Sequence, residues 1–100
     1  MAAYVISEVE VIDPMLMDKY RSLAQASIAS YGGRYIVRGG AAEVVEGSPP
    51  VAQLVIVEFP AIERAHEWYR SPQYAEALAV RQRALTRRLI FVDGVAAGAG

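Results

Sequence analysis

The stretch Val51-Ala52-Gln53-Leu54-Val55-Ile56-Val57-Glu58-Phe59-Pro60 decides the architecture that this sequence predicts. Apolar residues follow one another from Leu54 to Val57, which is typical of a strand with two buried faces. Pro60 ends the strand, because proline has no N–H to donate to a neighbouring strand. The helices of one small domain cover one face of such a strand. We therefore expect a second copy to cover the other face, in a homodimer packed sheet to sheet around an enclosed interior.

The composition indicates one globular domain. The chain has 100 residues, of which 54% are hydrophobic, and we expect a single domain over 1–95 with a flexible Ala/Gly tail over 96–100. The net charge of −1 gives no attraction for phosphate backbones, so no nucleic-acid partner is expected. The absence of Cys excludes disulfides and thiolate metal sites. Because no segment resembles a signal peptide or a membrane span, we expect a cytoplasmic protein with no membrane partner.

The other expected helices and strands come from residue periodicity and from signals at their ends. Asp13-Pro14 and Ser71-Pro72 are typical helix starts, and Gly32-Gly33 is a typical helix end. The elements expected besides the central strand are strands over 4–12, 34–38, 41–46 and 87–92, and helices over 14–31, 61–70 and from 72 onward. This order predicts an α+β, ferredoxin-like split βαβ fold, an antiparallel sheet with helices on one face.

Four segments of the sequence resemble one known family over residues 4–94. They are Gly32-Gly33-Arg34-Tyr35-Ile36-Val37-Arg38-Gly39-Gly40, Glu46-Gly47, Val57-Glu58-Phe59-Pro60, and Trp68-Tyr69-Arg70-Ser71-Pro72-Gln73-Tyr74 with Arg81. Together they are similar to the markers of domain of unknown function 1330. The resemblance implies the dimeric α+β barrel superfamily, whose members include cofactor-free monooxygenases, haem-degrading enzymes and muconolactone isomerase. It does not imply a reaction, because a fold by itself does not determine a function.

Two charged residues stand on strands that are otherwise largely apolar. Alternation places Arg38 on the face of Ile36, and Glu58 on the face of Ile56. If both faces point into the interior, the guanidinium can bind a carboxylate or enolate, and the desolvated carboxylate can act as a base. Arg38 and Glu58 are therefore the first candidate catalytic residues. The alternative is a structural ion pair, or a position at the exposed edge of the sheet.

His66 is the only histidine and the third candidate catalytic residue. It follows Glu63 at the spacing that places two metal ligands on one helical face. One such motif supplies fewer ligands than a metal site needs, so we expect neither a metal nor another cofactor. A general base or an axial haem ligand is one interpretation of His66. A partly exposed residue at the helix edge is the other.

Aromatic side chains and one arginine are the candidate ligand-binding residues, namely Tyr35, Trp68, Tyr69, Tyr74 and Arg81. The aromatic residues can line a pocket for a flat ligand, although aromatic residues at helical spacing usually belong to the core. Four arginines are interpreted as cations near a helix end, where they offset the helix dipole. They are Arg81, Arg83, Arg87 and Arg88.

The function expected is that of a small homodimer that binds an aromatic or carboxylate-bearing organic molecule. It would be a cofactor-independent enzyme of the monooxygenase or isomerase kind, with Glu58 as the base and Arg38 as the anion contact. A non-enzymatic dimer that senses a ligand or has a structural role is the alternative. A haem-handling protein that uses His66 is a further one.

Overall fold

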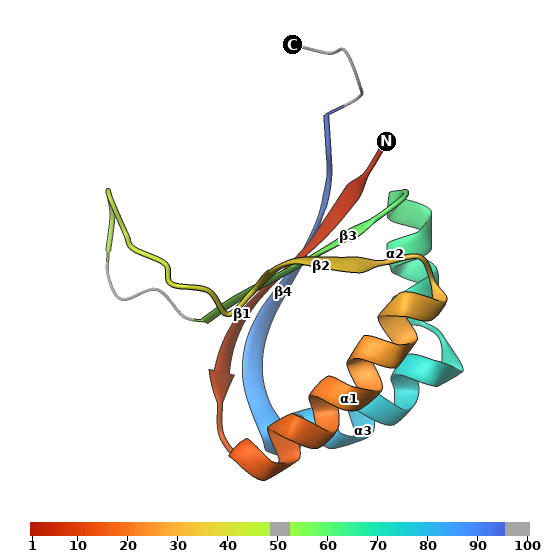
Figure 1. Ribbon diagram of the computed structural model, residues 1–100, viewed down its shortest axis with the longest axis horizontal. Coiled ribbons are helices and arrows are strands. Elements are labelled where there is room, and N and C mark those ends of the chain that lie inside the picture. Colours follow the sequence, from red (N-terminus) through yellow and green to blue (C-terminus); the bar gives the residue numbers. More distant parts are fainter. Residues whose placement is uncertain (49–52, 96–100) are drawn as a thin grey trace.

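The computed structural model describes residues 1–48 and 53–95 (Figure 1). Its elements in chain order are β1 (Ala3–Val11), α1 (Pro14–Ser30), β2 (Arg34–Arg38), β3 (Gln53–Phe59), α2 (Ile62–Tyr69), α3 (Pro72–Ala84) and β4 (Leu85–Asp93). The strands form one antiparallel sheet in the order β2-β3-β1-β4, and the helices lie on one side of it (Figure 1). The α+β, ferredoxin-like class is thereby confirmed. The expected tail over 96–100 and the expected start of the central strand at 51–52 lie outside the described residues.

The helix-end signals act as expected. The Asp13 carboxylate accepts hydrogen bonds from the backbone N–H groups of Met15 (3.0 Å) and Leu16 (3.2 Å), and α1 begins at the proline that follows it. The Ser71 hydroxyl oxygen accepts a bond from the Tyr74 N–H (3.1 Å) and starts α3 in the same way. Gly32 follows α1 with a φ of +80°, a conformation that favours glycine. No helix within 1–48 or 53–95 is both long and apolar enough to cross a bilayer.

The two-residue period of β1 divides the sheet into two different faces. Val5, Ser7 and Val9 are buried beneath the helices, whereas Tyr4 and Ile6 point to the side that carries no helix. β1 pairs with β3 on one side and with β4 on the other, so the same division extends across both neighbours. We call the two sides the helix face and the open face.

A β-bulge at Ile36 interrupts the alternation of β2. Tyr35 pairs with Val57 and Arg38 with Val55, and both of these β3 residues lie on the helix face. The register shift falls between Tyr35 and Val37, so Ile36 is the extra residue. One extra residue reverses the face of everything that follows it in the strand. Arg38 therefore points toward the helices, whereas strict alternation had predicted the opposite face.

The prediction of a strand over 41–46 is wrong. β2 ends at Arg38, and the Gly39 N–H donates to the Leu54 carbonyl (2.7 Å) with a φ of +70° at Gly39. Residues 41–48 are exposed throughout and form neither helix nor strand. Val44 and Val45 gave this segment its strand propensity, but both are exposed and pack on no apolar surface.

The junction between α3 and β4 has no loop. Leu85 is both the residue that caps α3 and the first residue of β4, and its side chain is 1% exposed. The expected start of this strand at 87 was therefore two residues late. Arg87 follows two positions after Leu85 and lies on the same face of the strand, together with Leu89.

The open face carries one apolar row, and the row on each side of it contains one ion pair. Val37, Ile56, Ile6 and Ile90 stand side by side across the sheet. On one side of this row Arg34 forms an ion pair with Glu58 (2.9 Å), and on the other Arg88 pairs with Glu8 (3.5 Å). No described helix covers this face (Figure 1).

Replacement of Gly33 by alanine is expected to destabilise the fold. An added Cβ would lie 2.7 Å from Ile28 Cγ2 and 2.7 Å from Phe59 Cε1, and both side chains are buried. We expect Gly33→Ala to lower the free energy of unfolding by about 1–3 kcal/mol in urea denaturation, as overpacking does in other cores. At Gly40 an added Cβ meets nothing within 4 Å. Gly40→Ala is thus the matched control, and equal stability of the two variants would contradict this packing.

Candidate functional site

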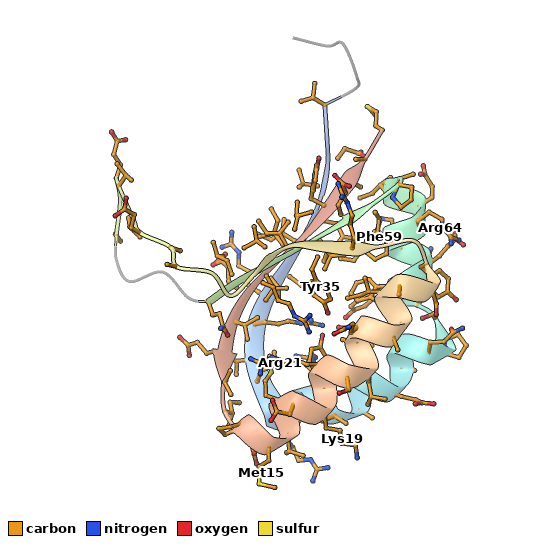
Figure 2. All side chains as sticks on the ribbon, viewed as in Figure 1. Met15, Lys19, Arg21, Tyr35, Phe59 and Arg64 are labelled. Carbon is orange, nitrogen blue, oxygen red and sulfur yellow. The ribbon has the colours of Figure 1, made fainter. Side chains whose placement is uncertain are left out.

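A cavity of about 250 Å³ lies between the helix face of the sheet and α1. Its sheet side is formed by Val5, Ser7, Val9, Val55, Val57 and Leu89, and its helix side by Met17, Tyr20, Arg21, Ala24 and Ile28. Figure 2 shows Tyr35 extending from β2 toward α1, and Arg21 on the side of α1 that faces the sheet. Most of the wall is apolar, and a few polar side chains converge on the interior. This combination is typical of sites for small organic molecules.

A guanidinium bound to two tyrosine hydroxyls forms one polar end of the cavity. Arg87 donates from Nη1 to the Tyr20 hydroxyl (2.8 Å) and from Nη2 to the Tyr74 hydroxyl (2.7 Å). The two hydroxyl oxygens lie 2.5 Å apart and share a hydrogen bond. Tyr20 and Arg87 are both in the cavity wall, and Tyr74 lies fully buried beside them. The contacts hold the guanidinium in one orientation.

The protonation of this cluster follows from its surroundings. Burial raises the pKa of Tyr74 above its ordinary value of 10.0, and the neighbouring Tyr20 raises it further, although Arg87 opposes the shift. Burial alone would lower the pKa of Arg87, but both tyrosine oxygens outweigh it and the pKa is raised. At neutral pH the guanidinium is therefore charged, and the Tyr74 hydroxyl keeps its proton.

A second cation lies at the exposed end of the cavity. The Arg38 guanidinium stacks over the Tyr35 ring, 4.3 Å from its centroid, and donates to the Gln25 Oε1 of α1 (2.9 Å). Burial raises the pKa of the Tyr35 hydroxyl, and the Arg38 charge opposes that shift. The bulge at Ile36 is what brings Arg38 to this side of the sheet.

The charge of the cavity wall differs from that of the whole chain. The wall contains Arg21, Arg38 and Arg87, and none of its described residues is Asp, Glu or His. Arg21 forms an ion pair with Asp18 (3.3 Å), whereas no described carboxylate lies within 4 Å of Arg38 or Arg87. The chain as a whole carries a net charge of −1. Two cations without an acidic partner, Arg38 and Arg87, therefore lie in the wall, and its low-dielectric surroundings strengthen their field.

Two serines have contrasting roles around the cavity. Ser27 accepts a hydrogen bond from the Trp68 indole N–H (3.0 Å) and donates to the Ala24 carbonyl (2.8 Å), which joins α2 to α1. Ser7 lies on the sheet side, is 6% exposed, and its hydroxyl has no partner among the described protein atoms. Leaving such a group without a hydrogen bond costs about 1–3 kcal/mol.

The model of the family described as a domain of unknown function (DUF1330) matches residues 2–95. The chain belongs to the DUF1330 family. The resemblance seen in the sequence markers is thereby confirmed, and it covers the whole of the described sheet and its helices.

Solved structures share the fold of this DUF1330 chain. They include RPA0582, a protein of unknown function from Rhodopseudomonas palustris (TM-score 0.76, 20% identity, 94% of this chain and 82% of that chain). They also include SnoaB, a cofactor-independent oxygenase from Streptomyces nogalater (0.67, 9%, 94% and 93%), and Rv0793 from Mycobacterium tuberculosis (0.58, 18%, 95% and 96%). At these identities the likeness establishes the fold alone, an α+β arrangement of one antiparallel sheet with helices on one face. No curated protein matches the chain.

The expected meeting of Arg38 and Glu58 does not occur in the DUF1330 chain. Glu58 shares the open face with Ile56 as expected, and its partner there is Arg34 at 2.9 Å. Arg38 lies on the helix face because of the bulge. The sheet thus separates the two side chains. A catalytic role for either of them stays a prediction.

His66 lies away from the cavity. Its side chain is exposed on α2, and its ring packs against Phe91 with the centroids 5.1 Å apart. Glu63, its partner in the expected motif, is also exposed. Within 1–48 and 53–95 no group of three or more potential metal-ligating residues comes together.

The candidate ligand-binding residues divide into three groups. Tyr35 and Trp68 line the cavity, and Tyr74 is fully buried beside Arg87. Tyr69 is 37% exposed and packs edge-on against Trp68. Arg81 on α3 has a buried Nε without a partner among the described atoms, and it is not in the described cavity wall. Their role in ligand binding stays a prediction.

Three residues of the cavity wall were not predicted as site residues from the sequence, namely Arg87, Tyr20 and Ser7. Arg87 was grouped with the helix-end cations, although it alternates with Leu85 and Leu89 and so interrupts an apolar strand face. Ser7 interrupts the apolar face of β1 in the same way. A polar residue within one buried face was the signal available in both cases.

Stability of the DUF1330 chain is expected to fall as the pH rises above 10. The folded state keeps the Tyr74 proton beyond pH 10.0, where the unfolded chain releases it, so the unfolded state binds fewer protons in that range. Each such tyrosine contributes a slope of about −1.4 kcal/mol per pH unit to the free energy of unfolding. In urea titrations from pH 8 to 11, Tyr74→Phe is expected to have a shallower decline than the wild type. Identical declines would contradict the burial of this hydroxyl.

Proposed function

We propose that the chain binds a small organic molecule, aromatic or carboxylate-bearing, in the cavity between the sheet and α1. The proposal rests on an apolar cavity of about 250 Å³ into which oriented polar side chains converge. Trp68 and Tyr35 provide flat surfaces for an aromatic ring, and Arg87 and Arg38 provide cations at separate places in the wall.

The cavity suits stabilisation of an anion better than removal of a proton. None of the described wall residues is a carboxylate or a histidine, and a tyrosine whose pKa is raised is a poor base near neutral pH. A reaction here of the cofactor-independent oxygenase or isomerase kind would use a substrate that ionises next to a guanidinium. The fold shared with SnoaB is compatible with this chemistry. Of the expected catalytic residues, the proposal retains Arg38 and assigns Glu58 and His66 no contact with the ligand.

Filling the cavity is expected to prevent binding. Ala24 is 2% exposed and lies in the helix side of the wall, so Ala24→Leu places additional carbon atoms in the ligand volume. We expect its affinity for 1-naphthoate and benzoate to fall at least about tenfold, since overpacking costs about 1–3 kcal/mol. The emission of Trp68, the only tryptophan, and isothermal calorimetry both measure the binding.

Ala26 provides the matched control. It lies two residues further along α1 and is exposed, so Ala26→Leu adds the same atoms outside the cavity. Wild-type affinity in Ala26→Leu together with lost affinity in Ala24→Leu is the expected result. Equal affinities in the two variants would place the ligand elsewhere.

A second copy of the chain is the proposed cover of the open face. The apolar row of Val37, Ile56, Ile6 and Ile90 crosses the described sheet without a covering layer. Burial of one large aliphatic side chain contributes about 1.5–3 kcal/mol. The ion pairs on the two sides of the apolar row present charges of both signs, which can pair with those of a second sheet packed on the first and so favour a homodimer.

Ile6→Lys is expected to dissociate this dimer. Ile6 lies in the apolar row on a central strand. In a twofold dimer the substitution removes this apolar side chain from both subunits of the interface. We expect the dimer dissociation constant to rise about 100-fold or more in sedimentation equilibrium. Met15→Lys, at an 84% exposed position on α1, is the control that should remain dimeric. A wild-type chain that sediments as a monomer at micromolar concentration would overturn the proposed dimer.

A further inference from the structure

Arg87 retains unused hydrogen-bond donors beside the cavity. A guanidinium has five N–H groups, and the tyrosine hydroxyls take one from each Nη atom. None of the described carboxylates lies within 4 Å of Arg87. The side chain is thus oriented by neutral groups, and its charge has no acidic partner in the described protein.

The hydrogen count of the tyrosine pair adds a further donor. Each hydroxyl oxygen accepts a bond from Arg87, and only one of the two hydroxyl hydrogens can lie between the oxygens. The other hydrogen makes no bond to another described residue. Tyr74 is fully buried outside the described wall, whereas Tyr20 is in the wall. The arrangement that leaves no buried hydrogen unpaired has Tyr74 donate to Tyr20, and Tyr20 direct its own hydrogen into the cavity.

Ser7 supplies a third donor on the sheet side of the same cavity. Its position in β1 pairs with Leu89, and Arg87 is paired two residues further along, so Ser7 and Arg87 are diagonal neighbours on one face. Such neighbours lie roughly 7–8 Å apart, within reach of a long side chain. The Ser7 hydroxyl is 6% exposed and has no described protein partner. A ligand atom near Arg87 can therefore be shared by both groups.

We infer that Arg87, Tyr20 and Ser7 form an oxyanion subsite that selects a carboxylate, or an enolate of similar shape, over a neutral ligand. The inference rests on the proposed function, because it concerns one end of the same cavity. All three residues offer donors, and a carboxylate is an acceptor with two oxygens that fit the guanidinium fork. A primary amide of the same shape carries no charge, and its NH₂ group finds no acceptor on the guanidinium, which has donors only.

Matched acids and amides test the subsite. Isothermal calorimetry at pH 7.5 compares benzoate with benzamide and 1-naphthoate with 1-naphthamide, which differ in charge while keeping the same ring. We expect each acid to bind at least about tenfold more tightly than its amide, as charge-assisted hydrogen bonds do. Equal binding of acid and amide overturns the subsite and leaves the proposed cavity in place. Binding of neither compound in both pairs overturns the proposed function itself.

Three variants separate a binding role from a structural one. Arg87→Gln is expected to bring the ratio of amide to acid dissociation constants close to one, and Arg83→Gln, which removes an exposed charge from α3, should keep the wild-type ratio.

Ser7→Ala is expected to weaken acid binding about fivefold or more while leaving the melting temperature of the free protein unchanged or raised, because an unsatisfied buried hydroxyl is removed. A lower melting temperature with unchanged acid affinity would show that Ser7 is structural and contradict the subsite. If Arg87→Gln does not fold, the acid-to-amide ratio of the wild type and the behaviour of Ser7→Ala decide the question.

Discussion

The two-residue period of the strands, broken once at Ile36, controls which side chains meet in this molecule. Helices cover only one face of the sheet, so alternation places each strand residue on the helix face or on the open face, except where the bulge shifts the register. The bulge moves Arg38 to the cavity and leaves Glu58 on the other side with Arg34. The separation of the two candidate catalytic groups is a direct consequence of one additional residue.

The second organising feature is a cation held by neutral groups. Desolvation opposes the guanidinium charge, and the hydroxyl oxygens of Tyr20 and Tyr74 offset that cost. A carboxylate in their place would have neutralised Arg87 within the protein. Because tyrosines orient the guanidinium and leave it charged, Arg87 stays without an acidic partner among the described residues.

Local signals predicted the element ends well and the site only in part. Capping by Asp13 and Ser71 depends only on residues next to them in the sequence, so it could be predicted. The end of α1 could be predicted as well, because Gly32 adopts a positive φ that favours glycine. The face of Glu58 followed from alternation. The bulge left no comparable signature, since its effect depends on the partner strand, and the expected face of Arg38 was therefore wrong. Alternation along β4 could have placed Arg87 on the helix face. Its contacts could not be predicted in this way, because Tyr20 and Tyr74 lie 67 and 13 residues away in the sequence.

Because no loop separates α3 from β4, a hydrogen bond between the two elements couples the start of the helix to the strand. Tyr74 lies in the first turn of α3. The last residue of α3 is followed directly by Leu85, the first residue of β4, and Arg87 is the third residue of that strand. Their side-chain hydrogen bond closes the 13-residue separation into a noncovalent ring. A shift of α3 relative to β4 would stretch that hydrogen bond. Any displacement of the Arg87 guanidinium therefore acts directly on the first turn of α3 as well as on β4.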